Sequence, residues 1–158
     1  MTRCRNTIGT LLVSILTVSM TFAGEQQPDI NAAVAGNNAF ALDLYAIVKN
    51  EQGNLFFSPY SISSALAMTY GGARGDTAEE MAKALHFTLG ADETHPAFAE
   101  LSREFDKIQK KGQVQLHVAN SLWPQRDYSL LPQYLALIKQ HYGVSITPVD
   151  YVKELSIN

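Results

Sequence analysis

The chain has 158 residues, of which 46% are hydrophobic and 17% charged, a composition ordinary for one folded globular domain. Its formal net charge at pH 7 is −3, and a mildly acidic chain is not built for general nucleic-acid binding. Composition therefore permits a compact domain, argues against a nucleic-acid partner and leaves the function open.

The N-terminus has the pattern of an export signal. Arg3 and Arg5 precede an uncharged apolar stretch over residues 8–20, and Ala23 is the small residue that a signal peptidase reads. The apolar stretch is shorter than the roughly 20 residues that span a bilayer, which disfavours a transmembrane anchor. We therefore expect cleavage between Ala23 and Gly24, and a secreted protein, extracellular or periplasmic, that is not attached to the membrane after cleavage.

Cys4 is the only cysteine, and it lies before the apolar stretch. Lipid attachment would need a cysteine directly after that stretch, so it is disfavoured. Once the signal is removed, the mature chain has no cysteine, which excludes disulfide-stapled scaffolds and thiol catalysis.

A polar segment over residues 24–31, which contains Pro28, is expected to form a flexible lead. The first helix is expected over residues 32–49, where apolar positions such as Val34 and Tyr45 recur at helical spacing.

A glycine and an asparagine at residues 53–54 break this helix, and the apolar run at residues 55–57 predicts a short strand. Ser58 is a good N-cap residue, and Pro59 directly after it suits a first helical turn. The next helix, expected over residues 59–70, carries no charged side chain. A short helix without a charged face should be buried on most sides.

Two further helices are expected before the middle of the chain. Asp76 and Thr77 each precede a glutamate by three residues, and these overlapping capping boxes predict a helix as far as about Leu85. Residues 94–111 have the clearest amphipathic pattern, which Gly112 ends.

Strand and helix signals alternate in the remainder. Apolar and polar residues alternate over residues 114–123, which predicts a strand with one buried face. Pro132 begins a helix that Gly143 ends. Residues 144–147 predict a final strand, and Pro148 confines it to the edge of a sheet.

The expected fold class is α+β, with about five helices and isolated strands. The two longer strands cannot each find two partners within this chain, and a two-stranded sheet among helices is a poor independent fold. We therefore expect the fold to be incomplete as a domain.

Several segments resemble the serpin family, both in their residues and in their order. Among them are segments that resemble the family's first helix, its most recognisable N-terminal segment, and the signature on a strand of its large central sheet. In chain order, the matching segments are residues 38–45, 54–68, 70–77, 119–123, 134–143 and 146–150. The resemblance implies that residues 32–158 are the N-terminal third of a serpin domain, after a signal peptide (1–23) and a flexible lead (24–31).

Serpins present an exposed loop as bait for a serine or cysteine protease. After cleavage the loop inserts as an extra strand into the large sheet and deforms the acylated protease, driven by a metastable native state. The bait loop lies near the family's C-terminus, so the resemblance implies a protease partner while no residue of this chain is expected to be the reactive centre.

The resemblance also implies three hinge residues below the sheet. Ser58 and Ser61 match positions where small hydroxyl side chains line the point at which the sheet opens, and Asn120 matches a strand asparagine near that region. They are expected to hydrogen-bond across the closed sheet and to exchange partners as it parts. The alternatives are a plain N-cap for Ser58 and a satisfied buried amide for Asn120.

Some serpins bind heparin-like polyanions on the fourth helix. Its basic residues here fall close to one face, but acidic residues interrupt them, which is more typical of an ordinary solvated charged face. Polyanion binding is therefore not expected, and its candidate residues are Arg103, Lys107, Lys110 and Lys111.

No enzyme constellation is present in the sequence, and no cofactor is expected. Its four histidines have no metal-ligand spacing, and it lacks a nucleophile elbow, a Walker loop and a dinucleotide fingerprint. The glycine-rich turn at residues 71–75 follows a helix, not a strand, so it is not expected to hold a phosphate.

Two interpretations compete. In the first, the chain is a shortened serpin; in the second, it is a secreted binding or scaffolding module that uses only the N-terminal region of the family. The end of the chain, where a further serpin helix should begin, favours a shortened serpin. We expect such a fragment to be loosely folded and to self-associate through unpaired sheet edges, without inhibiting a protease by itself.

Overall fold

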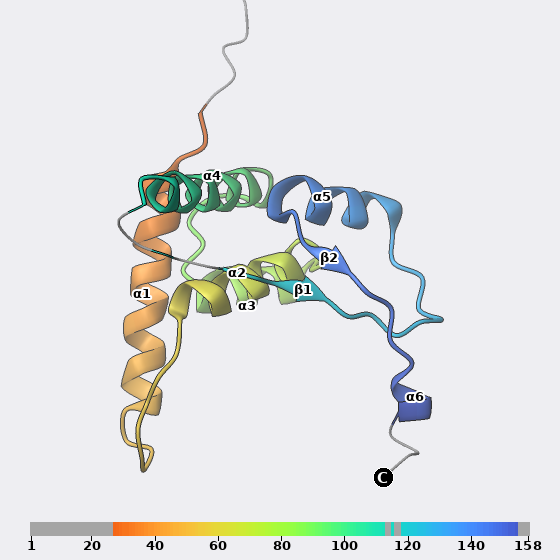
Figure 1. Ribbon diagram of the computed structural model, residues 1–158, viewed down its shortest axis with the longest axis horizontal. Coiled ribbons are helices and arrows are strands. Elements are labelled where there is room, and N and C mark those ends of the chain that lie inside the picture. Colours follow the sequence, from red (N-terminus) through yellow and green to blue (C-terminus); the bar gives the residue numbers. More distant parts are fainter. Residues whose placement is uncertain (1–26, 113–114, 116–117, 155–158) are drawn as a thin grey trace, which may run out of the picture.

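A computed structural model describes residues 27–112, 115 and 118–154 (Figure 1). The predicted signal peptide and its cleavage site between Ala23 and Gly24 lie outside these residues and stay a prediction. The elements in chain order are α1 (Ile30–Val48), α2 (Pro59–Tyr70), α3 (Asp76–Ala84), α4 (Ala91–Lys110), β1 (Ser121–Leu122), α5 (Pro132–Tyr142), β2 (Ser145–Ile146) and α6 (Tyr151–Glu154).

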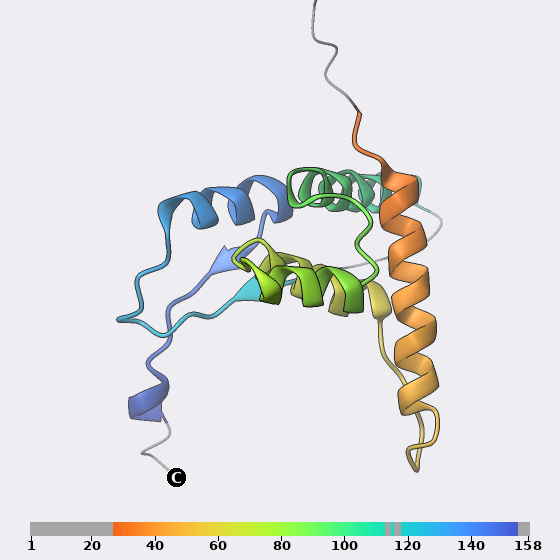
Figure 2. The same cartoon turned by 180° about the vertical axis from the view of Figure 1, so that it is seen from behind.

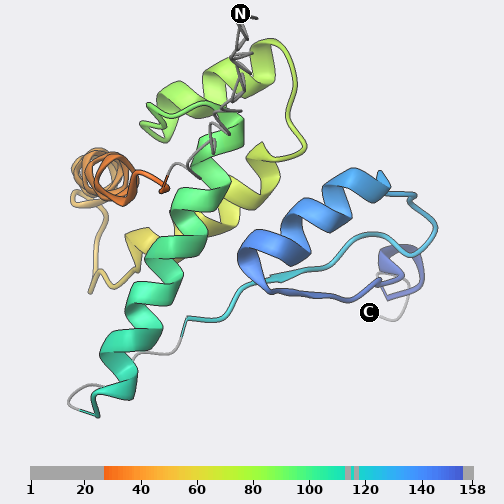
Figure 3. The same ribbon diagram turned by 90° about the horizontal axis from the view of Figure 1, so that it is seen from above.

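The described residues form two layers beside an upright helix. In Figures 1 and 2, α4 and α5 form the upper layer, and α2, α3 and both strands form the lower one. Helix α1 stands across the ends of both layers and contacts α2 and α4. Seen from above in Figure 3, α2 crosses beneath α4, and α5 approaches α4 with its C-terminal end.

Helix α1 begins at Ile30, so the predicted lead over residues 24–31 is wrong for its last two residues. The physical reason is a cap that lies in that segment. The Asp29 carboxylate accepts a hydrogen bond from the backbone N–H of Ala32 at 3.0 Å, which satisfies one of the free donors of the first turn.

Helix α2 has the predicted bounds, and Ser58 is its N-cap, accepting a hydrogen bond from the backbone N–H of Ser61 at 3.3 Å. Its burial is only partly as predicted. Ala67 and Met68 are buried against the helical layers, whereas Leu66 and Thr69 on another face are exposed. Among the described residues, no element covers that second face.

The predicted strand at residues 55–57 is wrong, because no described strand lies beside it to pair with its backbone. Phe56 in this segment is 99% exposed. The predicted capping boxes of α3 are wrong as well: Gly75 is the N-cap, with a φ of 56° that favours glycine, and no side chain caps the helix. Asp76 instead lies in the first turn, where a negative charge suits the helix dipole.

Helix α4 begins at Ala91, three residues before the predicted start, and includes Pro96. Asp92 and Glu93 in its first turn explain the earlier start, since acidic side chains stabilise the N-terminal end of a helix. Helix α5 has the predicted bounds, and Gly143 ends it in the left-handed conformation at φ 58°.

Among the described residues, the predicted strands are paired over two residues each. β1 and β2 pair in parallel, with Ser121 opposite Ser145 and Leu122 opposite Ile146. The strand predicted over residues 114–123 is paired only in β1; residues 113–114 and 116–117 lie outside the described chain, and residues 118–120 are irregular. A strand is defined by its neighbour, and β1 has one described neighbour over two residues only.

The core lies where α2, α4 and α5 meet. Phe98 of α4 is 2% exposed, and its ring lies near the rings of Tyr60, Phe87 and Tyr142 at centroid distances of 6.4, 5.5 and 6.5 Å. Ile138 of α5 and Ala67 of α2 are fully buried as well. In residues 27–112 and 118–154, no helix combines the length and apolar character that crossing a bilayer requires.

Candidate functional site

The N-terminal end of α2 carries two of the three predicted hinge residues. The Ser61 hydroxyl donates a hydrogen bond to the Ser58 hydroxyl oxygen at 3.0 Å. Ser58 is exposed and Ser61 half-buried. Among the described residues, neither hydroxyl bonds to Asn120, so the structure brings together two of the three predicted residues and separates the third.

Asn120 instead bonds to a serine farther along α2. Its side-chain N–H donates to the Ser64 hydroxyl oxygen at 3.1 Å. Ser64 is buried, and Asn120 is half-buried just before β1. This bond ties α2 to the chain that enters the sheet.

A second serine of α2 ties the helix to α1. The Ser63 hydroxyl lies 2.6 Å from the Asn37 side-chain oxygen, to which it donates, and 3.2 Å from its own helix's Tyr60 carbonyl. Sequence reasoning missed Ser63 and Ser64. Two adjacent serines in the middle of a helix without charged residues were the signal, because buried polar groups in such a place need partners from other elements.

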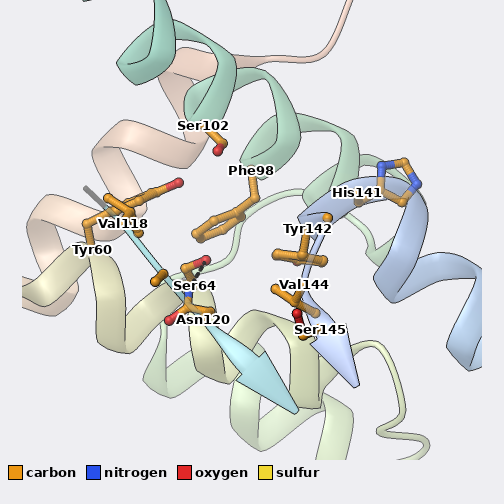
Figure 4. A pocket seen from close by; sticks show the side chains of 12 residues that line it. Tyr60, Ser64, Phe98, Ser102, Val118, Asn120, His141, Tyr142, Val144 and Ser145 are labelled. Atoms are coloured by element: carbon orange, nitrogen blue, oxygen red, sulfur yellow. Dashed lines mark hydrogen bonds between the residues drawn. The ribbon is translucent and has the colours of Figure 1, made fainter. Parts of the chain in front are cut away.

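A cavity of about 270 Å³ lies beside the Ser64–Asn120 bond (Figure 4). It is bounded by α2, by α4, by the end of α5 and by the segments next to β1 and β2. Phe98 and Tyr142 form part of its wall. The cavity gives the side chains at this junction room to rearrange if the strands move.

The described lining of this cavity carries no charge at neutral pH. Burial raises the pKa of the Tyr60 and Tyr142 phenols, so both keep their protons. Burial, with a smaller contribution from Arg103, lowers the pKa of His141, which leaves that imidazole neutral. The residues that line this cavity therefore suit a structural contact between α2, α5 and the strand segments better than acid–base chemistry.

Two of the four basic residues in or directly after the C-terminal half of α4, Arg103 and Lys107, pair with acids of the same helix. Arg103 Nε donates to Glu100 at 2.8 Å, and Lys107 Nζ donates to Glu104 at 2.6 Å. The hydrogen bond from Arg103 lowers the pKa of Glu100, and the bond to Glu104 raises the pKa of Lys107. Lys110 and Lys111 are exposed. This geometry agrees with a solvated charged face.

The histidines of the described chain do not form a metal site. His86 pairs with Asp43 at 2.7 Å, and His95 lies 2.8 Å from the Tyr142 hydroxyl. In residues 27–112, 115 and 118–154, no three histidine, cysteine or acidic residues are grouped to hold a metal ion. His117 lies outside the described residues.

Comparison with known sequences identifies the family. The family described as Serpin (serine protease inhibitor) matches residues 35–158. The chain therefore belongs to the serpin family.

Similarity to individual serpins supports the same family. The leukocyte elastase inhibitor of Bos taurus is 41% identical over 121 residues, which are 75% of this chain and 31% of the relative. An uncharacterized serpin-like protein of Thermococcus kodakarensis is 40% identical over 128 residues, 81% of this chain and 29% of the relative. The chain thus spans about a third of the length of these curated relatives.

Solved structures confirm the fold class. A tumour-suppressing serpin superposes with a TM-score of 0.68 at 27% identity, over 80% of this chain and 34% of that one. A cleaved serpin superposes with the same TM-score at 20% identity, again over 80% of this chain and 34% of that one. The described elements are therefore a part of the serpin fold, mostly helical with few strands.

Proposed function

We propose that the whole protein inhibits serine or cysteine proteases by insertion of a cleaved bait loop into its large sheet, and that this region supplies the hinge below that sheet. Membership of the serpin family supports the activity. The single observation that supports the hinge is the hydrogen bond between Asn120 and the buried Ser64, which joins α2 to the entry of β1.

The energy of such a bond suits a hinge. A hydrogen bond of this type contributes about 0.5–1.5 kcal/mol net, whereas a buried group left unpaired costs about 1–3 kcal/mol. The Ser64–Asn120 bond therefore resists small displacements of β1, yet it can break in a transition driven by the pairing of a new strand. Ser58 and Ser61 are proposed to act beside it, since their hydroxyls bond to each other and can exchange partners.

A chimera tests the inhibitory role. Residues 35–150 of this chain would replace the corresponding region of the bovine leukocyte elastase inhibitor, which it resembles at 41% identity. We expect the chimera to inhibit leukocyte elastase and to form a complex stable in SDS, because the N-terminal region must part correctly for loop insertion. A folded chimera that elastase cleaves as an ordinary substrate would contradict the proposal.

A double-mutant cycle in the same chimera tests the hinge. Ser64→Ala and Asn120→Ala are each expected to lower the free energy of unfolding, with a coupling energy of about 0.5–1.5 kcal/mol between them. Both should also raise the share of protease that cleaves the chimera without being trapped. Ser129→Ala, in an exposed loop, is the matched control and should change neither value. A coupling energy of zero with unchanged trapping would remove the hinge role.

The 158-residue polypeptide by itself is proposed not to inhibit, because none of its segments resembles the bait loop of the family. Incubated with trypsin-like and elastase-like proteases, it should leave their activity unchanged and yield no covalent complex on SDS gels. Dose-dependent inhibition by this polypeptide would contradict that, and would favour a binding module in its place.

A further inference from the structure

One buried histidine joins three helices. His95 of α4 is 2% exposed. Its ring lies near Tyr70 of α2 and Tyr142 of α5, at centroid distances of 6.0 and 5.8 Å. Its Cε1 atom would also lie 3.3 Å from a Cβ atom added at Gly71, so the imidazole is packed closely against the end of α2.

The imidazole has a hydrogen-bond partner for one nitrogen only. Its Nδ1 lies 2.8 Å from the Tyr142 hydroxyl, while Nε2 is buried without a partner in the described chain. A neutral imidazole has one N–H, but the protonated ring has two and carries a positive charge. A second proton would therefore place a charge in a buried site and leave at least one N–H without an acceptor, and both are costly.

Few groups near His95 can compensate that charge. From α2, Tyr70 faces the ring, and that helix carries no charged residue. From α5, Tyr142 and His141 face it, the latter with a ring centroid 6.3 Å away. On the same helix as His95, the Asp92 carboxylate favours protonation of the imidazole. Arg74, which carries a positive charge, lines a cleft together with His95 and Asp92.

We propose that the docking of α5 on α4 and α2 is pH-sensitive, with protonation of His95 placing a positive charge and an N–H without an acceptor in the buried helix interface and thereby loosening α5 together with the chain that leads into β2. This pH sensitivity is independent of protease inhibition. It rests on the burial of His95, its unpaired Nε2 and its single bond across the helix interface. Tyr142 and Gly143 also line the cavity beside the Ser64–Asn120 hydrogen bond, so loosening of α5 would change the surroundings of that bond.

The direction of the effect follows from linkage. Burial, with a smaller contribution from His141 and an opposing one from Asp92, lowers the pKa of His95 from 6.5 to about 4. A histidine whose pKa is lower in the docked state stabilises docking fully above pH 6.5, and this contribution is lost as the pH falls toward 4. At pH 5 the ratio of docked to undocked α5 should be about 30-fold lower than at pH 8.

Hydrogen exchange followed by NMR on the 158-residue chain measures this ratio. We expect protection factors of the α5 amides, corrected for intrinsic exchange, to fall about 30-fold between pH 8 and pH 5. His95→Asn, which keeps a polar group near the position of Nδ1 but cannot titrate, should abolish most of that fall. His141→Asn, the matched control in the neighbouring titrating position, should retain it. An equal fall in His95→Asn and the unaltered chain would overturn the proposal, as would constant protection in the unaltered chain.

A second measurement does not depend on how the variants fold. The Cε1 proton signal of His95 in the unaltered chain should titrate with a midpoint well below 5.5, together with changes in the Tyr142 ring signals. A midpoint near the ordinary value of 6.5 would overturn the proposal, because the docked state would then accept the proton freely.

Discussion

Replacing Phe98 with alanine is expected to lower the free energy of unfolding by about 3–5 kcal/mol, the usual cost of emptying a buried aromatic site. Phe98 is 2% exposed, and it touches α2, the α3–α4 connection and α5 through Tyr60, Phe87 and Tyr142. These partners come from three separate parts of the chain, so the site cannot collapse without moving whole helices. Since domains are stable by only about 5–15 kcal/mol, this one change should remove a large share of the total.

Urea unfolding of the chimera that carries residues 35–150, followed by far-UV circular dichroism, provides the measurement, because the fragment by itself is expected to be loosely folded. Phe56→Ala is the matched control, because the same side chain is 99% exposed at that position. Its effect should stay within about 0.5 kcal/mol, as for other surface substitutions. Equal shifts of the urea midpoint in both variants would show that Phe98 is not packed as described.

Replacing Gly36 with alanine is expected to destabilise the chain by about 1–3 kcal/mol, even though alanine favours helices. A Cβ atom at Gly36 would lie 2.5 Å from the His86 carbonyl oxygen, which is a backbone atom and cannot turn aside. Helix α1 would have to move away from the segment between α3 and α4. That movement would also strain the 2.7 Å pair between His86 and Asp43, which joins the same two parts of the molecule.

Gly90→Ala is the control for this substitution. A Cβ atom there has nothing within 4 Å, and the φ of −60° suits any residue. Its effect on the urea midpoint should be close to zero, with at most a slight gain from a less flexible unfolded chain. If Gly36→Ala were as mild as Gly90→Ala, the close approach of α1 to His86 would be wrong.

The elements that the sequence predicted correctly are those whose ends carry clear local signals. Ser58 and Pro59 start α2, and Pro132 and Gly143 start and end α5, each through caps or backbone restrictions within a few residues. The errors arose where several local signals competed. Asp76 and Asp29 are both good capping residues, but Asp29 caps its helix while Asp76 lies inside the first turn after Gly75.

The strands could not be predicted to the same degree. Alternation of apolar residues indicates which face of a strand is buried, but pairing depends on a neighbour that the pattern does not specify. Hence the residues at 55–57 have strand character without a strand, and the described residues of the long pattern before Trp123 are paired only at Ser121 and Leu122.

By itself, therefore, the sequence determined the family, the bounds of α2 and α5, and Ser58, Ser61 and Asn120 as candidate hinge residues. Only the tertiary structure decided their partners. Asn120 bonds to Ser64 across 56 residues, and His95 meets Tyr142 across 47. Caps and turns act within one or two helical turns, so the sequence displays them directly. A hydrogen bond between distant residues depends on how whole helices cross, and no local pattern of residues displays that.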